Sequence, residues 1–232
     1  MTNKTSTMSQ LGLFSTPSAP IVAKEFSWTK QSFFALDIET NGLNPAADRI
    51  IEIALVPFNM SCDSHINQLI SIPTPLPLEI QKITGINDNM LKNKPSFIDV
   101  ADRILGSIKN ADFIVAYNAA FDKPFLESEL ARVNKALPNI PWVDPFVFIC
   151  EIDRYKKGKK LIDAAKRWGV SLEDAHRAHN DALAAGELLL KLSSTIAIDD
   201  LKDLVEKQSI LFWKNAHNRH EMQQKQEWSI NR

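Results

Sequence analysis

Two carboxylates stand at the end of the first apolar run of the chain. Residues 32–38 read Ser-Phe-Phe-Ala-Leu-Asp-Ile, a pattern typical of a buried strand, and Asp37 and Glu39 are two positions apart. Because side chains alternate along a strand, both carboxylates are predicted to lie on one face of an otherwise apolar sheet. Burying these anions is costly unless a cation compensates, and no Lys or Arg lies within the run. The pair therefore indicates a divalent cation.

Two more apolar runs follow closely. Residues 49–56 and 64–72 are strand-like, and the segment 41–45, Asn-Gly-Leu-Asn-Pro, has turn chemistry. Three successive strands predict an antiparallel start to the sheet. One alternative stays open for the acids, in which the first strand ends at Leu36 and both carboxylates are solvated in a turn.

Helical and strand-like patterns alternate in the rest of the chain. Apolar side chains recur at helical spacing over residues 95–108, 123–133 and 180–192, and short strand-like runs cover 111–117 and 142–144. We therefore predict an α/β fold, in which a mixed sheet is flanked by helices and has a parallel portion at its far side.

A chain of 232 residues has room for one domain with tails. Residues 1–30, rich in Ser, Thr and Pro, are predicted to be a flexible arm, 31–195 the domain, and 196–232 a polar helical tail. No apolar run of about 18 residues occurs, so we expect a cytoplasmic protein without a membrane partner. Cys62 and Cys150 lie far apart, so neither a disulfide framework nor a structural zinc site is expected.

Two more acids stand at predicted element boundaries. Asp122 follows the run 111–117, and Asp181 opens the late helix. Four carboxylates with few histidines suit Mg²⁺ or Mn²⁺ rather than zinc, and two such ions would stabilise the attacking and leaving oxygens of a phosphodiester displacement. His176, just upstream of Asp181, is suited to take a proton from water, because a free imidazole titrates near about 6.5.

Three segments carry these residues: Asp37-Ile38-Glu39-Thr40, Asn118-Ala119-Ala120-Phe121-Asp122 and His176-xxxx-Asp181. Together they resemble the three motifs of the DEDDh 3′–5′ exonucleases, the family of the proofreading epsilon subunit of bacterial DNA polymerase III. The resemblance covers roughly residues 32–195. It implies a ribonuclease H-like fold and an enzyme that hydrolyses DNA from its 3′ ends, preferably single-stranded, to nucleoside 5′-monophosphates.

The resemblance also implies a role for each motif residue. Asp37 would bridge two Mg²⁺ or Mn²⁺ ions, and Asp122 would serve one of them. Glu39 and Asp181 would complete the site on the side of the nucleophile, and His176 would activate water. The 3′-terminal nucleotide would be held at four positions, namely Thr40, Leu43, Asn118 and Phe121.

The chain departs from the family pattern at two positions. Tyr117 stands where many relatives have a histidine before the asparagine, and we interpret it as a residue that ends the strand. His179 is an additional histidine within the third motif, and we expect it on the surface where the helix begins.

The N-terminal arm contains the segment Gln10-Leu11-Gly12-Leu13-Phe14, which resembles the short peptide by which bacterial replication and repair proteins dock on the β sliding clamp. Leu11, Leu13 and Phe14 would enter an apolar pocket, and Gln10 would form hydrogen bonds at its rim. The alternative is that these side chains fold back onto the domain. Clamp binding or a DNA polymerase partner would bring the enzyme to DNA without a basic surface.

Charge gives no global sign of a polyanionic partner, because 27 Lys+Arg and 28 Asp+Glu leave a net charge of −1. Two local segments are basic. Residues 154–160 either neutralise substrate phosphates or form a solvated helix end, and residues 213–220 combine Trp213 with several cations. That second segment either stacks on nucleic acid or is a surface helix with one anchoring tryptophan.

Two other functions remain open. The first is an exoribonuclease of the ribonuclease T or oligoribonuclease kind, which the clamp-like peptide disfavours. The second is a non-catalytic, clamp-binding adaptor, which the five filled catalytic positions disfavour.

Overall fold

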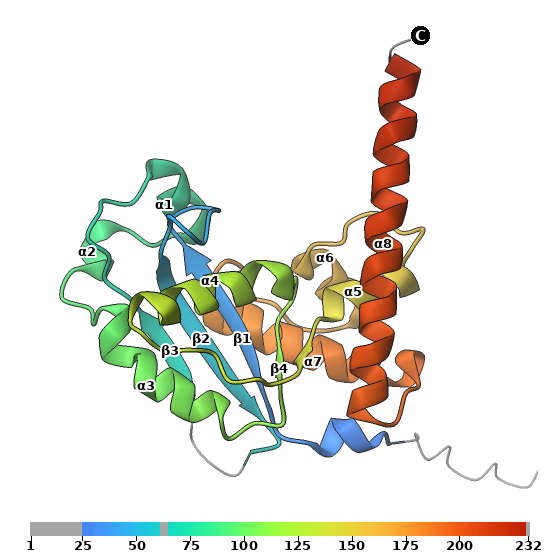
Figure 1. Cartoon of the computed structure of the whole chain (residues 1–232), viewed down its shortest axis with the longest axis horizontal. Coiled ribbons are helices and arrows are strands. Elements are labelled where there is room, and N and C mark those ends of the chain that lie inside the picture. The colour runs from blue at the N-terminus through green and yellow to red at the C-terminus, as the bar shows by residue number, and fades with distance from the viewer. Residues whose placement is uncertain (1–24, 61–64, 231–232) are drawn as a thin grey trace, which may run out of the picture.

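The computed structural model describes residues 25–60 and 65–230, which form a five-stranded sheet covered by helices (Figure 1). The order across the sheet is β3-β2-β1-β4-β5. β1 pairs antiparallel with β2, which pairs antiparallel with β3, whereas β4 is parallel to both β1 and β5. The mixed sheet expected from the sequence is confirmed. Its strands are β1 (Phe33–Thr40), β2 (Ile50–Phe58), β3 (Ile66–Leu69), β4 (Phe113–Val115) and β5 (Trp142–Val143).

β1 is the central strand, and its apolar side chains enter two separate cores. Phe33 and Ala35 belong to one hydrophobic cluster, whereas Phe34 and Leu36 belong to the other. A strand buried on both faces reads as a continuous apolar run, as this one does. The alternation then places Asp37 and Glu39 on the same side as Ala35.

Helices α3 (Phe97–Ile108) and α4 (Ala119–Arg132) cover the face of Leu36, and α5 (Pro145–Ile152), α6 (Leu161–Trp168) and α7 (Ala178–Ile196) pack with the opposite cluster. α7 lies very close to the sheet. A Cβ at Gly186 would come within 2.4 Å of the Phe58 ring and 3.1 Å of the Ala35 side chain, so glycine is required there.

The sequence patterns missed five short elements and misplaced one helix start. α5 is almost entirely apolar and so shows little helical period, and η1, α1 and α2 are short, whereas α6 has a clear helical pattern that the sequence analysis overlooked. α4 begins four residues before the expected residue 123, and the expected third strand forms only over β3. The missed elements are the 3₁₀ turn η1 (Ser27–Lys30), α1 (Leu78–Thr84), α2 (Asp88–Leu91), α5 and α6.

The folded part of the chain begins earlier than the expected boundary after residue 30. Phe26 and Trp28 are buried, and the Trp28 indole Nε1 donates a hydrogen bond of 2.8 Å to the Ile198 carbonyl. Ser27 N–H adds a bond of 3.0 Å to the Asp199 carboxylate. Residues 25–30 therefore belong to the domain. The clamp-like residues Gln10, Leu11, Leu13 and Phe14 lie outside the described part of the chain.

The C-terminal helix α8 (Leu201–Ile230) begins as part of the domain. Leu204 and Leu211 are buried in the cluster that contains α5 and α7. The Gln208 side chain donates to the Trp142 carbonyl at 3.0 Å and accepts from Asp144 N–H at 2.6 Å, which ties α8 to β5. Figure 1 shows the rest of α8 extending beyond the sheet. Within the described residues, no helix combines the length and apolar character needed to cross a membrane.

Trp28→Ala should lower the free energy of unfolding by about 3–5 kcal/mol, because a fully buried tryptophan is replaced by a cavity. Urea denaturation followed by circular dichroism measures this. Trp213→Ala is the matched control, since Trp213 is 71% exposed, and it should change stability by less than about 0.5 kcal/mol. An equally small effect of Trp28→Ala would contradict the assignment of residues 25–30 to the domain.

Candidate active site

β1 carries two of the acids to the open end of the sheet. The strand continues to Thr40, so the alternative in which it ends at Leu36 is wrong. Asp37 and Glu39 are half-buried, and both line a cavity of about 600 Å³. Glu52 of β2 lies opposite Glu39, which adds a third carboxylate to this face of the sheet.

The third acid comes from the first turn of α4. Asn118 precedes that helix in the left-handed conformation, with φ of 69°, which asparagine tolerates better than most residues. Its N–H and that of Ala119 donate to the buried Asp144 carboxylate at 2.8 and 3.0 Å, which fixes the start of the helix. Asp122 follows and is only 3% exposed, and its charge adds to the repulsion felt by Asp37.

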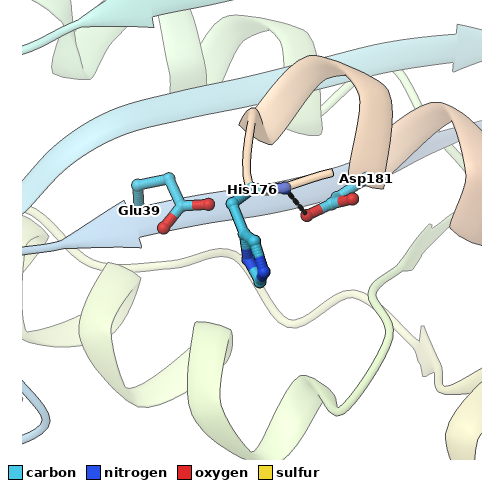
Figure 2. A group of neighbouring side chains, drawn as sticks. All are labelled: Glu39, His176 and Asp181. Atoms are coloured by element: carbon cyan, nitrogen blue, oxygen red, sulfur yellow. Dashed lines mark hydrogen bonds between the residues drawn. The ribbon is translucent and has the colours of Figure 1, made fainter. Parts of the chain in front are cut away.

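The third motif closes the site from α7. One ligand atom from each of Glu39, His176 and Asp181 lies within 4.8 Å of the others. Figure 2 shows His176 between the two carboxylates, with its backbone N–H donating to Asp181 Oδ2 at 3.1 Å. His176 has φ of 71°, a strained conformation for a residue other than glycine, and such strain is concentrated at functional sites.

Burial and mutual repulsion oppose ionisation of all four acids. The pKa of Asp37 lies well above its usual range, first because of burial and then because of the neighbouring acids Asp122 and Asp181. Burial, with repulsion from Asp181 and Glu52, raises the pKa of Glu39 to about 8. The pKa values of Asp122 and Asp181 are raised as well, again mainly by burial.

These residues fit a divalent cation. Asp181 Oδ1 is buried and has no hydrogen-bond partner within the described structure. Arg177 lowers the pKa of Glu39, but its guanidinium is already paired with Glu52. A cluster of oxygen ligands without a neutralising side chain is typical of a metal site.

Glu52 and Arg177 are positioning residues that the sequence analysis missed. Arg177 Nη2 lies 2.9 Å from Glu52 Oε1, and Ala178 N–H donates to Glu52 Oε2 at 3.2 Å. Glu52 is 1% exposed, so this pair fixes the start of α7 and thereby the backbone between His176 and Asp181. The available signal was a single acid within the apolar run Ile50-Ile51-Glu52-Ile53.

Two of the four residues expected to hold a nucleotide line the cavity. Asn118 and Phe121 are among its walls, together with Phe146, which the sequence analysis did not single out. Thr40 is buried, and its hydroxyl donates to the Gly42 carbonyl at 2.6 Å. Leu43 is 82% exposed on the loop after β1, outside the cavity wall.

Tyr117 and part of the basic segment also line the cavity. The Tyr117 hydroxyl donates to the Lys159 carbonyl, and burial raises its pKa, so the side chain holds the loop and is not set up to transfer protons. Lys159 and Lys160 line the cavity. Lys156 instead forms an ion pair with Asp153 at 3.0 Å.

His179 was expected on the surface, and this expectation is wrong. Its ring is half-buried and stacks on that of His65, with centroids 4.6 Å apart. Burial lowers its pKa. His179 is absent from the cavity wall, whereas His176 is part of it.

Comparison with known proteins agrees with this geometry. A family model described as an exonuclease domain (RNase T) matches residues 34–189. DNA polymerase III subunit epsilon of Treponema pallidum is 34% identical over 160 residues, covering 68% of this chain and 74% of that protein. DNA polymerase III PolC-type of Clostridium perfringens is 33% identical over 188 residues, which are 75% of this chain but only 12% of that protein.

Solved structures share the fold. E. coli exonuclease I in complex with a dT13 oligonucleotide superposes with a TM-score of 0.58 at 20% identity, covering 71% of this chain and 41% of that one. The nuclease domain of 3′hExo, a DEDDh family member bound to rAMP, gives 0.60 at 15% identity, covering 72% and 93%. The fold is that of ribonuclease H-like exonucleases. The chain belongs to the exonuclease family, within its DEDDh group, and is thus a nuclease of a class that depends on divalent metal ions.

The raised pKa values predict a stability that depends on pH and on metal. A folded-state pKa above the unfolded value stabilises the fold at low pH, and this contribution is lost as pH rises through the folded pKa. In EDTA, stability should therefore fall as pH approaches about 8, the pKa of Glu39. Mn²⁺ should raise the melting temperature more at that pH than at about pH 5, where protons on the acids compete with the metal.

Asp37→Asn should raise the melting temperature in EDTA at alkaline pH by about 2–4 °C, or roughly 1 kcal/mol, because one buried repulsion is removed. It should also abolish most of the stabilisation by Mn²⁺. Differential scanning fluorimetry measures both effects, and Glu79→Gln, an exposed acid on α1, is the control. A variant destabilised in EDTA would contradict the electrostatic account.

Proposed function

We propose that the protein is a 3′–5′ exonuclease that hydrolyses DNA to nucleoside 5′-monophosphates with two bound divalent cations. The approach of Glu39, His176 and Asp181 to within 4.8 Å of one another carries the proposal. Membership of the exonuclease family supports it.

The four acids would hold the cations, which are Mg²⁺ or Mn²⁺ because every carboxylate ligand is a hard oxygen donor. Asp37, Glu39 and Asp181, which line the cavity, would hold the ions together with the adjacent Asp122. When bound, the ions would offset the charge on the attacking and leaving oxygens of the phosphodiester. Binding would also displace the protons that the raised pKa values retain.

His176 would act as the general base. Its ring is exposed to the cavity, and its backbone is fixed by the bond to Asp181. An imidazole between two carboxylates is placed to accept a proton from the attacking water and to be stabilised when it becomes charged. The Arg177–Glu52 pair would keep this ring in place.

The remaining walls would receive the 3′-terminal nucleotide. Phe121 and Phe146 offer aromatic surface to the base, and Asn118 offers an amide for hydrogen bonds. Lys160 is exposed at the rim and would contact a phosphate, whereas Lys159 Nζ donates to the Asp153 carbonyl. Thr40 would act through its backbone, and Leu43 would cover the base from the loop.

The likeness to an epsilon subunit supports a role in replication proofreading or repair, with a DNA polymerase as partner. The exoribonuclease alternative is supported by one neighbour, 3′hExo, whose structure contains rAMP. A direct comparison of DNA and RNA substrates separates the two.

A time course with 5′-labelled single-stranded DNA tests the function. With Mg²⁺ or Mn²⁺ we expect a ladder that shortens from the 3′ end, and EDTA or Asp37→Ala should abolish it. His176→Ala should lose about 10²–10⁴-fold in rate, the usual contribution of a positioned base. If the DNA stays intact while RNA of the same sequence is degraded, the exoribonuclease is favoured. If both DNA and RNA stay intact, the non-catalytic adaptor is favoured.

We also propose that the segment Gln10–Phe14 docks on the β sliding clamp. A synthetic peptide of this sequence should bind purified clamp, and replacing Leu13 and Phe14 by alanine in the full chain should abolish clamp binding while leaving hydrolysis of free oligonucleotides unchanged. Isothermal titration calorimetry measures the first effect. Equal binding by the variant would show that the segment is not the docking element.

A further inference from the structure

A groove leaves the catalytic cavity between α5 and α8. Asn118 and Phe146 line the catalytic cavity and also a neighbouring cavity of about 300 Å³, whose far wall includes Phe212 of α8. A third cavity of about 260 Å³ shares Phe212 with the second and reaches Trp213. Each cavity shares wall residues with the next, so the three adjoin one another between the acids and α8.

The wall on α8 is aromatic and exposed. Trp213 is 71% and Phe212 39% exposed, and their rings meet edge to face with centroids 5.8 Å apart. The helix beneath them is anchored by the buried side chain of Leu211 and by the hydrogen bonds of Gln208. These rings are therefore presented by a fixed surface, and α8 lies beyond residues 34–189 that the family model matches.

The charges along the groove are compatible with the phosphates of a nucleic-acid strand. Lys123 lines the groove, and its Nζ is 6.0 Å from the centroid of the Trp142 ring. Asp144 is the one acid among the residues that line the two outer cavities. Its carboxylate already accepts the N–H groups of Asn118, Ala119 and Phe146, so it offers little repulsion to a phosphate.

We propose that this groove binds the nucleotides of a single strand that lie 5′ to the terminal one, with bases stacked on Phe212 and Trp213 and a phosphate near Lys123. The inference rests on the proposed function, because a strand whose 3′ end occupies the cavity must continue along an adjoining surface. Stacking on aromatic side chains is tolerant of sequence, as a processive or proofreading enzyme requires. α8 thus extends the substrate site of this chain beyond residues 34–189, the part that the family model matches.

The test is a length series of single-stranded DNA with the double variant Phe212→Ala/Trp213→Ala. A dinucleotide occupies only the catalytic cavity, whereas a dodecamer also reaches α8. KM for the dodecamer should rise at least about tenfold, since loss of even one stacked base weakens binding by about that factor, and KM for the dinucleotide should not change. Ile210→Ala is the matched control, because Ile210 is 56% exposed on the same helix and does not line the groove.

Binding of 5′-fluorescein-labelled oligothymidylate in Ca²⁺, measured by fluorescence anisotropy, separates failure of the groove from failure of the proposed function. Weaker binding by the double variant than by wild type supports the groove even if no hydrolysis is seen. Equal binding, or an equal loss with dinucleotide and dodecamer, overturns it. A change in sedimentation without a change in DNA binding also overturns it and would make the aromatic surface a contact between two copies of the chain.

Discussion

Repulsion among four half-buried or buried carboxylates at the open end of the central strand is the constraint that organises this structure. β1 supplies Asp37 and Glu39, and the first turns of α4 and α7 supply Asp122 and Asp181. Ionisation of each acid costs more free energy there than in water, and the pKa of each is therefore raised. A bound cation would relieve the repulsion among these carboxylates. This relief is the physical reason to expect a metal ion at this site.

Two further buried carboxylates have a different task, because each is satisfied by the protein. Asp144 accepts backbone N–H groups at the start of α4, and Glu52 accepts Arg177 and the Ala178 N–H at the start of α7. Both helices carry an acid of the proposed metal site in the first turn, so the satisfied acids hold the unsatisfied ones in place. Preorganisation of this kind by outer residues is general in metal sites.

Local patterns were sufficient to predict the sheet and to single out acids and a histidine that the structure brings to one cavity. The alternation at Asp37 and Glu39, and the spacing between His176 and Asp181, are short-range features, and the fold follows the family they resemble. The ion pair of Glu52 with Arg177 joins residues 125 positions apart, and no local pattern reports such a contact. The same applies to the burial of Trp28 under the turn at Ile198.

Where the sequence analysis failed, a tertiary contact decided the outcome. α5 is apolar except for Glu151 and packs with the hydrophobic cluster that includes α7 and α8, so it lacks the broad polar face that reveals a helix. His179 was expected in solvent, but it stacks on His65, the residue before β3. Trp213 is exposed and lines a cavity beside α4 and α5, which no local pattern in the sequence indicates.

The most direct test of the central claim is calorimetric titration of the protein with Mn²⁺ near neutral pH, in two buffers of different ionisation enthalpy. The account predicts binding with release of protons to the buffer, because acids with raised pKa values must lose them to become ligands. Asp37→Asn should weaken the binding and reduce the release. Absence of binding, or binding without proton release, would contradict the claim that these acids form a cation site.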